Sequence, residues 1–256
     1  MKQIITLLLL FTFHYSFSQT KISKNDLETF DTLYNELYEG NSEKAIKSVD
    51  SIYALAIKNN NKILEILMLH IQALHTVNKG DFKNSNILYL KQNNKISNLN
   101  TSYLKDSLLV DNLWLHGDAQ LTFGDVPNAI KSFNKSLLIA KKIKNNKFIG
   151  VIYYYLGNAY FKQKLYNDAI FYYGECIKYD TSEKTKSFVN GNLGSIYAIK
   201  KEYKLAEKYL LEHLNSINSN NFYNLSLSNN NIGHLYTGIK DYKKAHTYFL
   251  KANKIR

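Results

Sequence analysis

The residues able to perform chemistry are few and scattered along this chain. Seven histidines and a single cysteine, Cys176, are present. His70 and His75 are five residues apart, whereas four residues would place two imidazoles on one helix face. No His-Glu-x-x-His, Cys-x-x-Cys, acidic calcium loop or Gly-x-Ser-x-Gly sequence occurs. We therefore expect no catalytic residues, no metal site and no cofactor, and we expect that the protein is not an enzyme.

The composition favours an all-α protein with a sizeable core. Of the 256 residues, 45% are hydrophobic, while there is one proline and only 11 glycines, too few for the turns of a β fold. The formal net charge is +12, but basic residues occur at most in adjacent pairs such as Lys141-Lys142. Such scattered lysines indicate solvated helix faces rather than a nucleic-acid footprint. No nucleic-acid partner is expected.

Residues 1–18 have the three-part layout of a secretory signal peptide. Lys2 supplies a positive start, an apolar stretch runs from Ile4 to Phe13, and Ser16 and Ser18 lie at the −3 and −1 positions before Gln19. The apolar stretch is shorter than the ~20 residues that span a bilayer. We expect cleavage, export to the periplasm or the medium, and no transmembrane helix in the mature chain. An uncleaved membrane anchor is the alternative.

A pattern near forty residues long recurs in the mature part, residues 19–256. Its core is apolar-Gly-x-x-Tyr, followed nine residues later by Ala and four residues after that by an aromatic residue or Leu. The pattern is clearest in three places: Gly157, Tyr160, Ala169 and Tyr173; Gly194, Tyr197, Ala206 and Leu210; and Gly233, Tyr236, Ala245 and Phe249. Such a period is the signature of a repeat array.

This pattern resembles the tetratricopeptide repeat, whose usual period is ~34 residues. In that register, repeats start near residues 26, 66, 110, 150, 187 and 226. The resemblance implies an all-α, right-handed α-α superhelix of about six helix-turn-helix repeats, with longer helices or loops than usual. Cys176 stands where the family usually has Ala, so a buried, inert thiol is expected there.

Each repeat is expected to be two antiparallel helices joined by a short turn. Glycine inside a helix costs ~1 kcal/mol relative to alanine, a cost that a close helix-helix approach would offset. We therefore predict that Gly157, Gly194 and Gly233 lie in first helices, with Ala169, Ala206 and Ala245 as their small partners. This role also accounts for Gly194 in Gly191–Ser195, a segment faintly like a phosphate loop. Asp125 before Val126-Pro127 predicts a capped start of a second helix.

The family resemblance implies that the first helices line a concave groove that binds a peptide. The residues expected to point into it are Trp114, Asp118, Tyr154, Asn158, Lys162, Asn192, Ser195, Asn230, Asn231 and His234. Asparagine offers two donors and an acceptor on a short stem, so recurring asparagines suit an extended peptide backbone. The alternative is that Asn is abundant in this chain and merely tolerated there. A clamp for a peptide carboxylate is doubtful, because Tyr154 stands where a Lys would be expected.

The leading hypothesis is thus a non-catalytic scaffold outside the cytosol that binds a protein or peptide. The alternative is the sensor region of an envelope signal-transduction system, stand-alone or truncated before its output domain. No capping helix follows Ala252, so self-association through the C-terminal end, docking to a partner or a truncated gene are all open. Partner identity is beyond the sequence.

Overall fold

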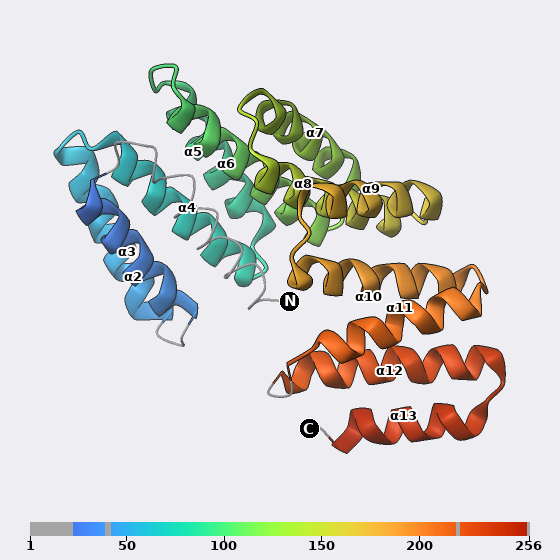
Figure 1. The fold of residues 1–256 in the computed structure, drawn as a ribbon. Helices are drawn as coiled ribbons and strands as arrows, with labels where there is room; N and C mark the ends of the chain where they lie inside the picture. The colour runs from blue at the N-terminus through green and yellow to red at the C-terminus, as the bar shows by residue number, and fades with distance from the viewer. Residues whose placement is uncertain (1–22, 39–41, 219–220, 255–256) are drawn as a thin grey trace. The chain divides into compact units, whose positions relative to one another are not determined.

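A computed structural model describes residues 23–38, 42–218 and 221–254; the predicted signal peptide lies outside these residues. The described residues form helices and turns only (Figure 1). The helices, labelled as in Figure 1, are α2 (Lys24–Tyr38), α3 (Ser42–Lys58), α4 (Lys62–Asn78), α5 (Phe82–Ser97), α6 (Tyr103–Thr122), α7 (Val126–Lys142), α8 (Asn146–Lys162), α9 (Tyr166–Tyr179), α10 (Glu183–Ile199), α11 (Tyr203–Ser216), α12 (Phe222–Ile239) and α13 (Tyr242–Lys254). The prediction of an all-α helical-repeat fold is confirmed.

The chain divides into two units, one up to Tyr155 and one from Leu156, so the division falls within α8. In the first unit, α4 forms the centre of the core, with Ile66, Leu67 and Leu69 fully buried. In the second unit, Leu210 of α11 packs with Ile232 and Leu235 of α12. In the described part of the chain, no helix has the length and apolarity that a membrane crossing requires.

The predicted role of the helix glycines is confirmed, but their direct partners differ from the prediction. A Cβ atom added to Gly157 would lie 2.5 Å from Cε1 of Tyr173, and one added to Gly194 would lie 2.6 Å from Cγ of Leu210. Gly117 faces Phe133 and Gly233 faces Phe249 in the same way. Each glycine thus faces the residue four positions after the alanine of the repeat pattern, because that longer side chain reaches across the space that the glycine leaves.

The alanines are buried one turn earlier on the second helix, where Ala169 and Ala206 have no exposed surface. We call the contact between each first-helix glycine and the second helix the joint. Beside each joint, two tyrosine rings stack, one from each helix. The pairs are Tyr160–Tyr172, Tyr197–Tyr209 and Tyr236–Tyr248, with ring centroids 4.9, 5.5 and 5.6 Å apart. The tyrosines of the repeat pattern, Tyr160, Tyr197 and Tyr236, therefore fill the space next to the glycine contact.

Seven of the described turns share one design: a residue in the left-handed conformation is followed by the residue that directly precedes the next helix. Gly80 and Gly124 take the left-handed place, with φ of 78° and 93°, and residues with side chains take it in the other five turns: Asn60, Lys144, Lys164, Lys201 and Lys240. The next residue commonly caps the helix. Asp125 accepts a hydrogen bond from the backbone N–H of Asn128, as the Asp-Val-Pro sequence predicted.

The predicted repeat starts at residues 26, 66, 110, 150, 187 and 226 fall inside the first helices α2, α4, α6, α8, α10 and α12, a few residues after each helix begins. The first helices thus begin before the predicted repeat starts, and the additional residues at their N-terminal ends contribute to the long period. In α8 that extension begins after Asn145, whose side chain accepts a hydrogen bond from the N–H of Phe148.

Candidate functional site

The residue after each joint glycine is polar, and all four such residues were predicted to line the groove. They are Asp118 in the first unit and Asn158, Ser195 and His234 in the second. Because each follows a glycine that packs against the second helix, its side chain begins at the edge of the helix-helix joint. The packing that builds each hairpin thus also fixes where these polar groups emerge.

Asn158 is the most firmly placed of the four. Its side-chain Oδ1 accepts hydrogen bonds from Tyr173 Oη at 2.7 Å and from Asn192 Nδ2 at 3.0 Å. Tyr173 can reach it because Gly157 leaves room for the ring. With Oδ1 held by two donors, the Nδ2 group of Asn158 points its two N–H bonds elsewhere, and Asn158 is partly exposed. Two predicted residues, Asn158 and Asn192, are therefore brought together.

The other predicted residues of the second unit differ in their contacts and exposure. Ser195 donates to the backbone carbonyl of Gly191 in its own helix. His234 is exposed and lies edge-on to Phe249, with ring centroids 5.2 Å apart. Asn230 and Asn231 are partly buried on α12, and no hydrogen bond in the described part of the chain links either of them to Asn158. Lys162 is exposed at the last residue of α8.

In the first unit, the prediction for Trp114 needs correction. Its side chain has 1% of its surface exposed, its ring centroid is 5.1 Å from that of Tyr155, and its Nε1 donates to Asp111 Oδ1 at 3.0 Å. Because an indole is large and apolar, packing against Tyr155 buries it. It therefore has no open surface to offer a ligand. Tyr154 is partly buried and stands edge-on to Tyr155.

Acidic groups in the first unit lie in a poorly solvated environment. Burial raises the pKa of Asp118 to about 7 and also raises that of Asp111 to about 7. Asp111 Oδ2 lies 3.7 Å from Nδ1 of His70, whose pKa burial lowers to about 3. Asp111 and His70 face the interior, so they are poorly suited to bind a peptide, whereas Asp118 is partly exposed.

Comparison with known proteins agrees with the repeat pattern. The tetratricopeptide repeat family matches the chain twice, over residues 151–182 and residues 227–256. Both matched segments begin in the first helix of a hairpin and contain its joint glycine, Gly157 or Gly233. This chain is a tetratricopeptide repeat protein. No curated protein matches its sequence significantly.

Solved structures share the fold of this tetratricopeptide repeat protein. BtubC (BKLC) from P. vanneervenii is 20% identical, with a TM-score of 0.71 over 84% of this chain and 90% of that one. The pilF protein of Pseudomonas aeruginosa is 14% identical, with a TM-score of 0.64 over 91% and 94% of the two chains. The signal transduction ATPase PH0952 from Pyrococcus horikoshii, which has a tetratricopeptide repeat sensor, is 15% identical, with a TM-score of 0.69 over 92% of this chain and 38% of that one. At these identities the likeness establishes the fold alone.

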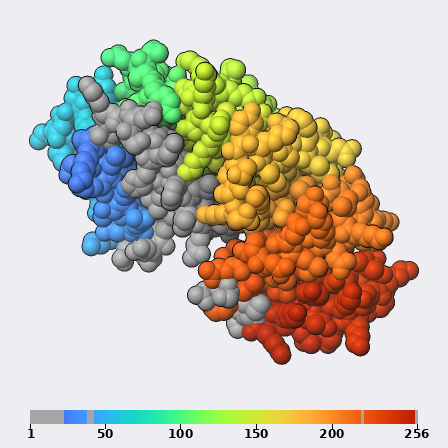
Figure 2. Space-filling model, in the orientation of Figure 1, coloured from blue at the N-terminus to red at the C-terminus, as the bar shows by residue number. Residues whose placement is uncertain are grey.

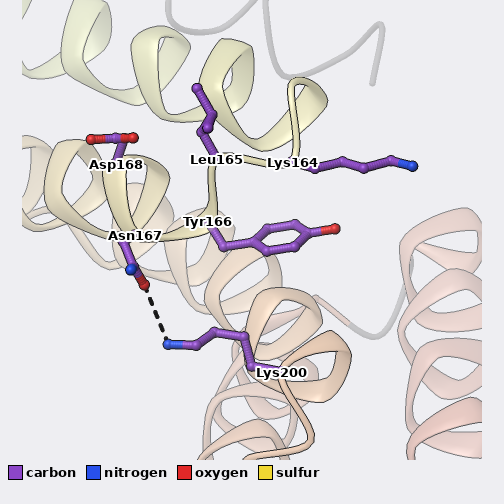
Figure 3. A pocket seen from close by; sticks show the side chains of 6 residues that line it. All are labelled: Lys164, Leu165, Tyr166, Asn167, Asp168 and Lys200. Atoms are coloured by element: carbon purple, nitrogen blue, oxygen red, sulfur yellow. Dashed lines mark hydrogen bonds between the residues drawn. The ribbon is translucent and has the colours of Figure 1, made fainter.

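Two surface hollows of this tetratricopeptide repeat protein contain none of the ten predicted residues. One, of about 330 Å³, is lined by Lys164, Leu165, Tyr166, Asn167, Asp168 and Lys200 (Figure 3). Lys200 Nζ donates to Asn167 Oδ1 at 3.4 Å, and the other side chains diverge instead of converging on one point. The second, of about 430 Å³, lies in the first unit, where Gln72 donates to Asp50 at 2.6 Å. Neither arrangement assembles a nucleophile with a base.

Among the described residues, no group of three or more His, Cys, Asp or Glu side chains could hold a metal ion. Cys176 is fully buried on α9, as its place in the repeat predicted.

The two matches to the repeat family support a protein-binding repeat scaffold as the general class of this chain.

Sequence reasoning missed Tyr173 as a member of the site. The signal was present, because the equivalent positions carry Leu210 and Phe249, which lack a hydroxyl. A tyrosine at a position otherwise apolar indicates a hydrogen-bond partner nearby. That this partner is Asn158 required the structure.

Proposed function

We propose that this protein is a non-catalytic scaffold that acts outside the cytosol and binds an extended segment of another protein along the first helices of its second unit. The observation that carries the proposal is the fixed amide of Asn158. Tyr173 and Asn192 both donate to its Oδ1, so the Nδ2 donors are held in one orientation before any ligand arrives. Preorganised donors bind a peptide carbonyl at a lower cost in side-chain entropy.

The surroundings of Asn158 suit a polypeptide better than a small molecule. Along the first helices, Ser195, Asn230, Asn231 and His234 add polar groups at or near the surface, and partly exposed Asn192 lies beside Asn158. A polypeptide backbone presents carbonyl and N–H groups at regular intervals, and amide and hydroxyl side chains bind both. The hollow beside Lys200 lacks the converging polar groups of a typical small-molecule site.

Peptide selection tests the binding proposal. Peptides selected from a random ten-residue library against the purified chain would be titrated against the wild type and against Asn158→Ala and Tyr173→Phe. We expect Asn158→Ala to weaken binding about tenfold, the loss of roughly one hydrogen bond. Tyr173→Phe should weaken binding less, because the amide remains but is no longer held in place.

Asn190→Ala is the matched control. Asn190 lies on α10 near Asn192, but its side chain donates to Glu212 at 3.1 Å, away from Asn158. Binding by this variant should equal that of the wild type. Failure to select any peptide, or equal affinities for all variants, would remove the Asn158 surface from consideration.

Export is tested separately. The signal-peptide pattern of residues 1–18 supports it, with an expected mature N-terminus at Gln19. Cell fractionation with N-terminal sequencing should find the processed chain in the periplasm or medium. Full-length chain starting at Met1 in the cytosol would refute export while leaving the binding proposal intact.

A second candidate function is the sensor region of a signalling system. It is supported by the fold likeness to the ATPase with a tetratricopeptide repeat sensor, over 92% of this chain. In that case peptide binding would change the activity of a separate output protein. Co-purification with a kinase or DNA-binding protein whose activity depends on the bound peptide would favour the sensor over the scaffold.

A further inference from the structure

The hollow of about 430 Å³ in the first unit is lined by side chains from three helices, α3, α4 and α5. Helix α4 contacts both α3 and α5. Figure 2 shows atoms of α3, in light blue, and of α5, in green, at the surface of the first unit. Of the described residues that line the hollow, only Asp50 of α3 and Lys91 of α5 carry a charge. The hollow therefore presents one negative and one positive group to a ligand.

The carboxylate of Asp50 is held in place by a neutral partner. Gln72 of α4 donates a hydrogen bond from Nε2 to Asp50 Oδ1 at 2.6 Å. The second oxygen, Oδ2, keeps its acceptor capacity. In the described part of the chain, no ion pair engages Asp50. A ligand's ammonium group would supply the cation that this carboxylate lacks.

The ammonium group of Lys91 is held by an aromatic ring. Its Nζ lies 4.9 Å from the centroid of the Tyr53 ring, which belongs to α3. A cation–π contact attracts the charge without a hydrogen-bond acceptor, so the N–H donors of Lys91 remain available to a carboxylate. Tyr53 follows Asp50 by three residues on α3, which places the two side chains on one face of that helix. The two charged groups therefore lie in the same part of the hollow.

Apolar side chains adjoin both charges. Ile46 precedes Asp50 by four residues on α3, and Ile87 precedes Lys91 by four residues on α5, so each shares a helix face with its charged neighbour. Ile87 is 51% exposed. An aliphatic group bound here would remove that apolar surface from water.

His75 of α4 adds a hydrogen-bonding group without a charge. Burial and then the positive charge of Lys79 lower the pKa of His75, while the carboxylate of Asp50 acts in the opposite direction. The imidazole is therefore neutral at pH 7 and offers one donor and one acceptor. A neutral polar group of this kind suits an amide or carboxyl group of a ligand.

We propose that this hollow binds a small zwitterion, an amino acid or a dipeptide, that has an aliphatic side chain. The ammonium group of the ligand would pair with Asp50 and its carboxylate with Lys91, while the aliphatic side chain would cover Ile87. The site lies in the first unit and shares no residue with the surroundings of Asn158. Its test is therefore independent of the proposed function.

Titration calorimetry of the purified chain with four probes tests this proposal. The probes are leucine, leucylalanine, and leucylalanine blocked either by N-terminal acetylation or by C-terminal amidation. We expect saturable binding of leucine or of leucylalanine, and the tighter of the two gives the length of the ligand. Each block removes one charge from the dipeptide and should weaken its binding about fivefold, the upper end for an exposed ion pair.

Two charge variants assign each end of the ligand to its partner. Asp50→Asn removes the negative charge but keeps an oxygen for Gln72, and Lys91→Gln removes the positive charge. Each should weaken binding of the unblocked probe about fivefold. Asp50→Asn should have no further effect on the acetylated probe, and Lys91→Gln should have none on the amidated probe, because in each case the interaction is already lost.

Glu43→Gln and Lys47→Gln are the matched controls, because both residues are exposed on α3 and neither lines the hollow. These variants should bind the unblocked probe as the wild type does. Since Asp50 and Lys91 are also exposed, all four variants should keep the circular dichroism spectrum of the wild type.

Three results would overturn the proposal. The first is the absence of saturable binding by both leucine and leucylalanine. The second is equal binding of the blocked and unblocked dipeptides, which would show that the charged ends play no part. The third is binding that Asp50→Asn and Lys91→Gln weaken no more than the control variants do, which would place the ligand elsewhere on the chain.

Discussion

The two units use the same glycine joint but place their polar groups differently. In the first unit, Asp118 follows the joint glycine and burial raises its pKa to about 7. In the second unit, Asn158 occupies the equivalent position and is held at the edge of the joint by Tyr173 and Asn192. The comparison teaches that the joint places a polar side chain at the same point of each hairpin, while the groups around it set the solvation and the hydrogen bonds of that side chain.

The largest expected effect concerns the buried carboxylate of the first unit. Asp111 is 4% exposed and its pKa is raised from 3.8 to about 7. Between these pH values the folded state keeps a proton that the unfolded chain releases, so stability falls as pH rises. Asp111→Asn lacks this loss. Relative to that of the wild type, its free energy of unfolding, measured with urea, should rise by up to roughly 4 kcal/mol between pH 4 and pH 8.

His70→Gln gives a check of opposite sign. Because burial lowers the pKa of His70 to about 3, the wild type loses stability as pH falls below the unfolded value of 6.5. The free energy of unfolding of His70→Gln should therefore rise relative to that of the wild type as the pH falls. If the Asp111→Asn difference did not vary with pH, the desolvation of Asp111 in the first unit would be wrong.

The second effect tests the joint itself. Gly157→Ala places a methyl group 2.5 Å from the fully buried ring of Tyr173, so we expect destabilisation of about 2 kcal/mol from overpacking. Gly233→Ala should cost less, because Phe249 is partly exposed and has room to turn. Thermal and urea unfolding measure both.

Gly174→Ala is the matched control for the joint glycines. Gly174 lies within α9, and an added Cβ would meet nothing within 4 Å. Here only the helix propensity changes, so the variant should be stabilised by roughly 0.5–1 kcal/mol. Equal effects of Gly157→Ala and Gly174→Ala would show that close packing against Tyr173 does not require a glycine at position 157.

A smaller effect is expected in the turns. Lys164 adopts a left-handed conformation with φ of 63°, which costs a residue with a side chain roughly 1 kcal/mol. Lys164→Gly relieves this strain but adds flexibility to the unfolded chain, so a net gain of about 0.5 kcal/mol is expected in urea unfolding. Gly124→Ala, at φ of 93°, should lose stability. A loss for both variants would show that Lys164 has a compensating contact.

The smallest effect on stability comes from Tyr173→Phe. This change makes the α8–α9 joint like that of α12–α13, where Phe249 faces Gly233. The ring still fills the joint and Asn192 still donates to Asn158, so stability should fall by less than about 0.5 kcal/mol, the low end for one neutral hydrogen bond. The side-chain amide of Asn158 should become more mobile in nuclear magnetic resonance relaxation. An unchanged amide would mean that Asn192 alone holds it.

The joint glycines could be read from the sequence because glycine, alanine and tyrosine recur at fixed intervals, and the Asp125 cap of α7 could be read from Asp-Val-Pro. The predicted partner of each glycine was one turn off, since small residues suggested a contact that the longer Tyr173 and Leu210 actually make. Of the candidate site, Asn158 and Asn192 were found from their register. Trp114 was misjudged because register gives a direction on a helix but not what packs over it.

The sequence by itself determined that this chain folds as helical hairpins, since spacing along one chain dictates which residues share a helix face. It also determined the signal-peptide prediction, which depends on residue order alone. Only the tertiary structure decided that Tyr173 orients Asn158 and that Asp111 is desolvated. These facts depend on contacts between separate helices, and small differences in packing distance set whether a polar atom meets a partner, an apolar wall or water.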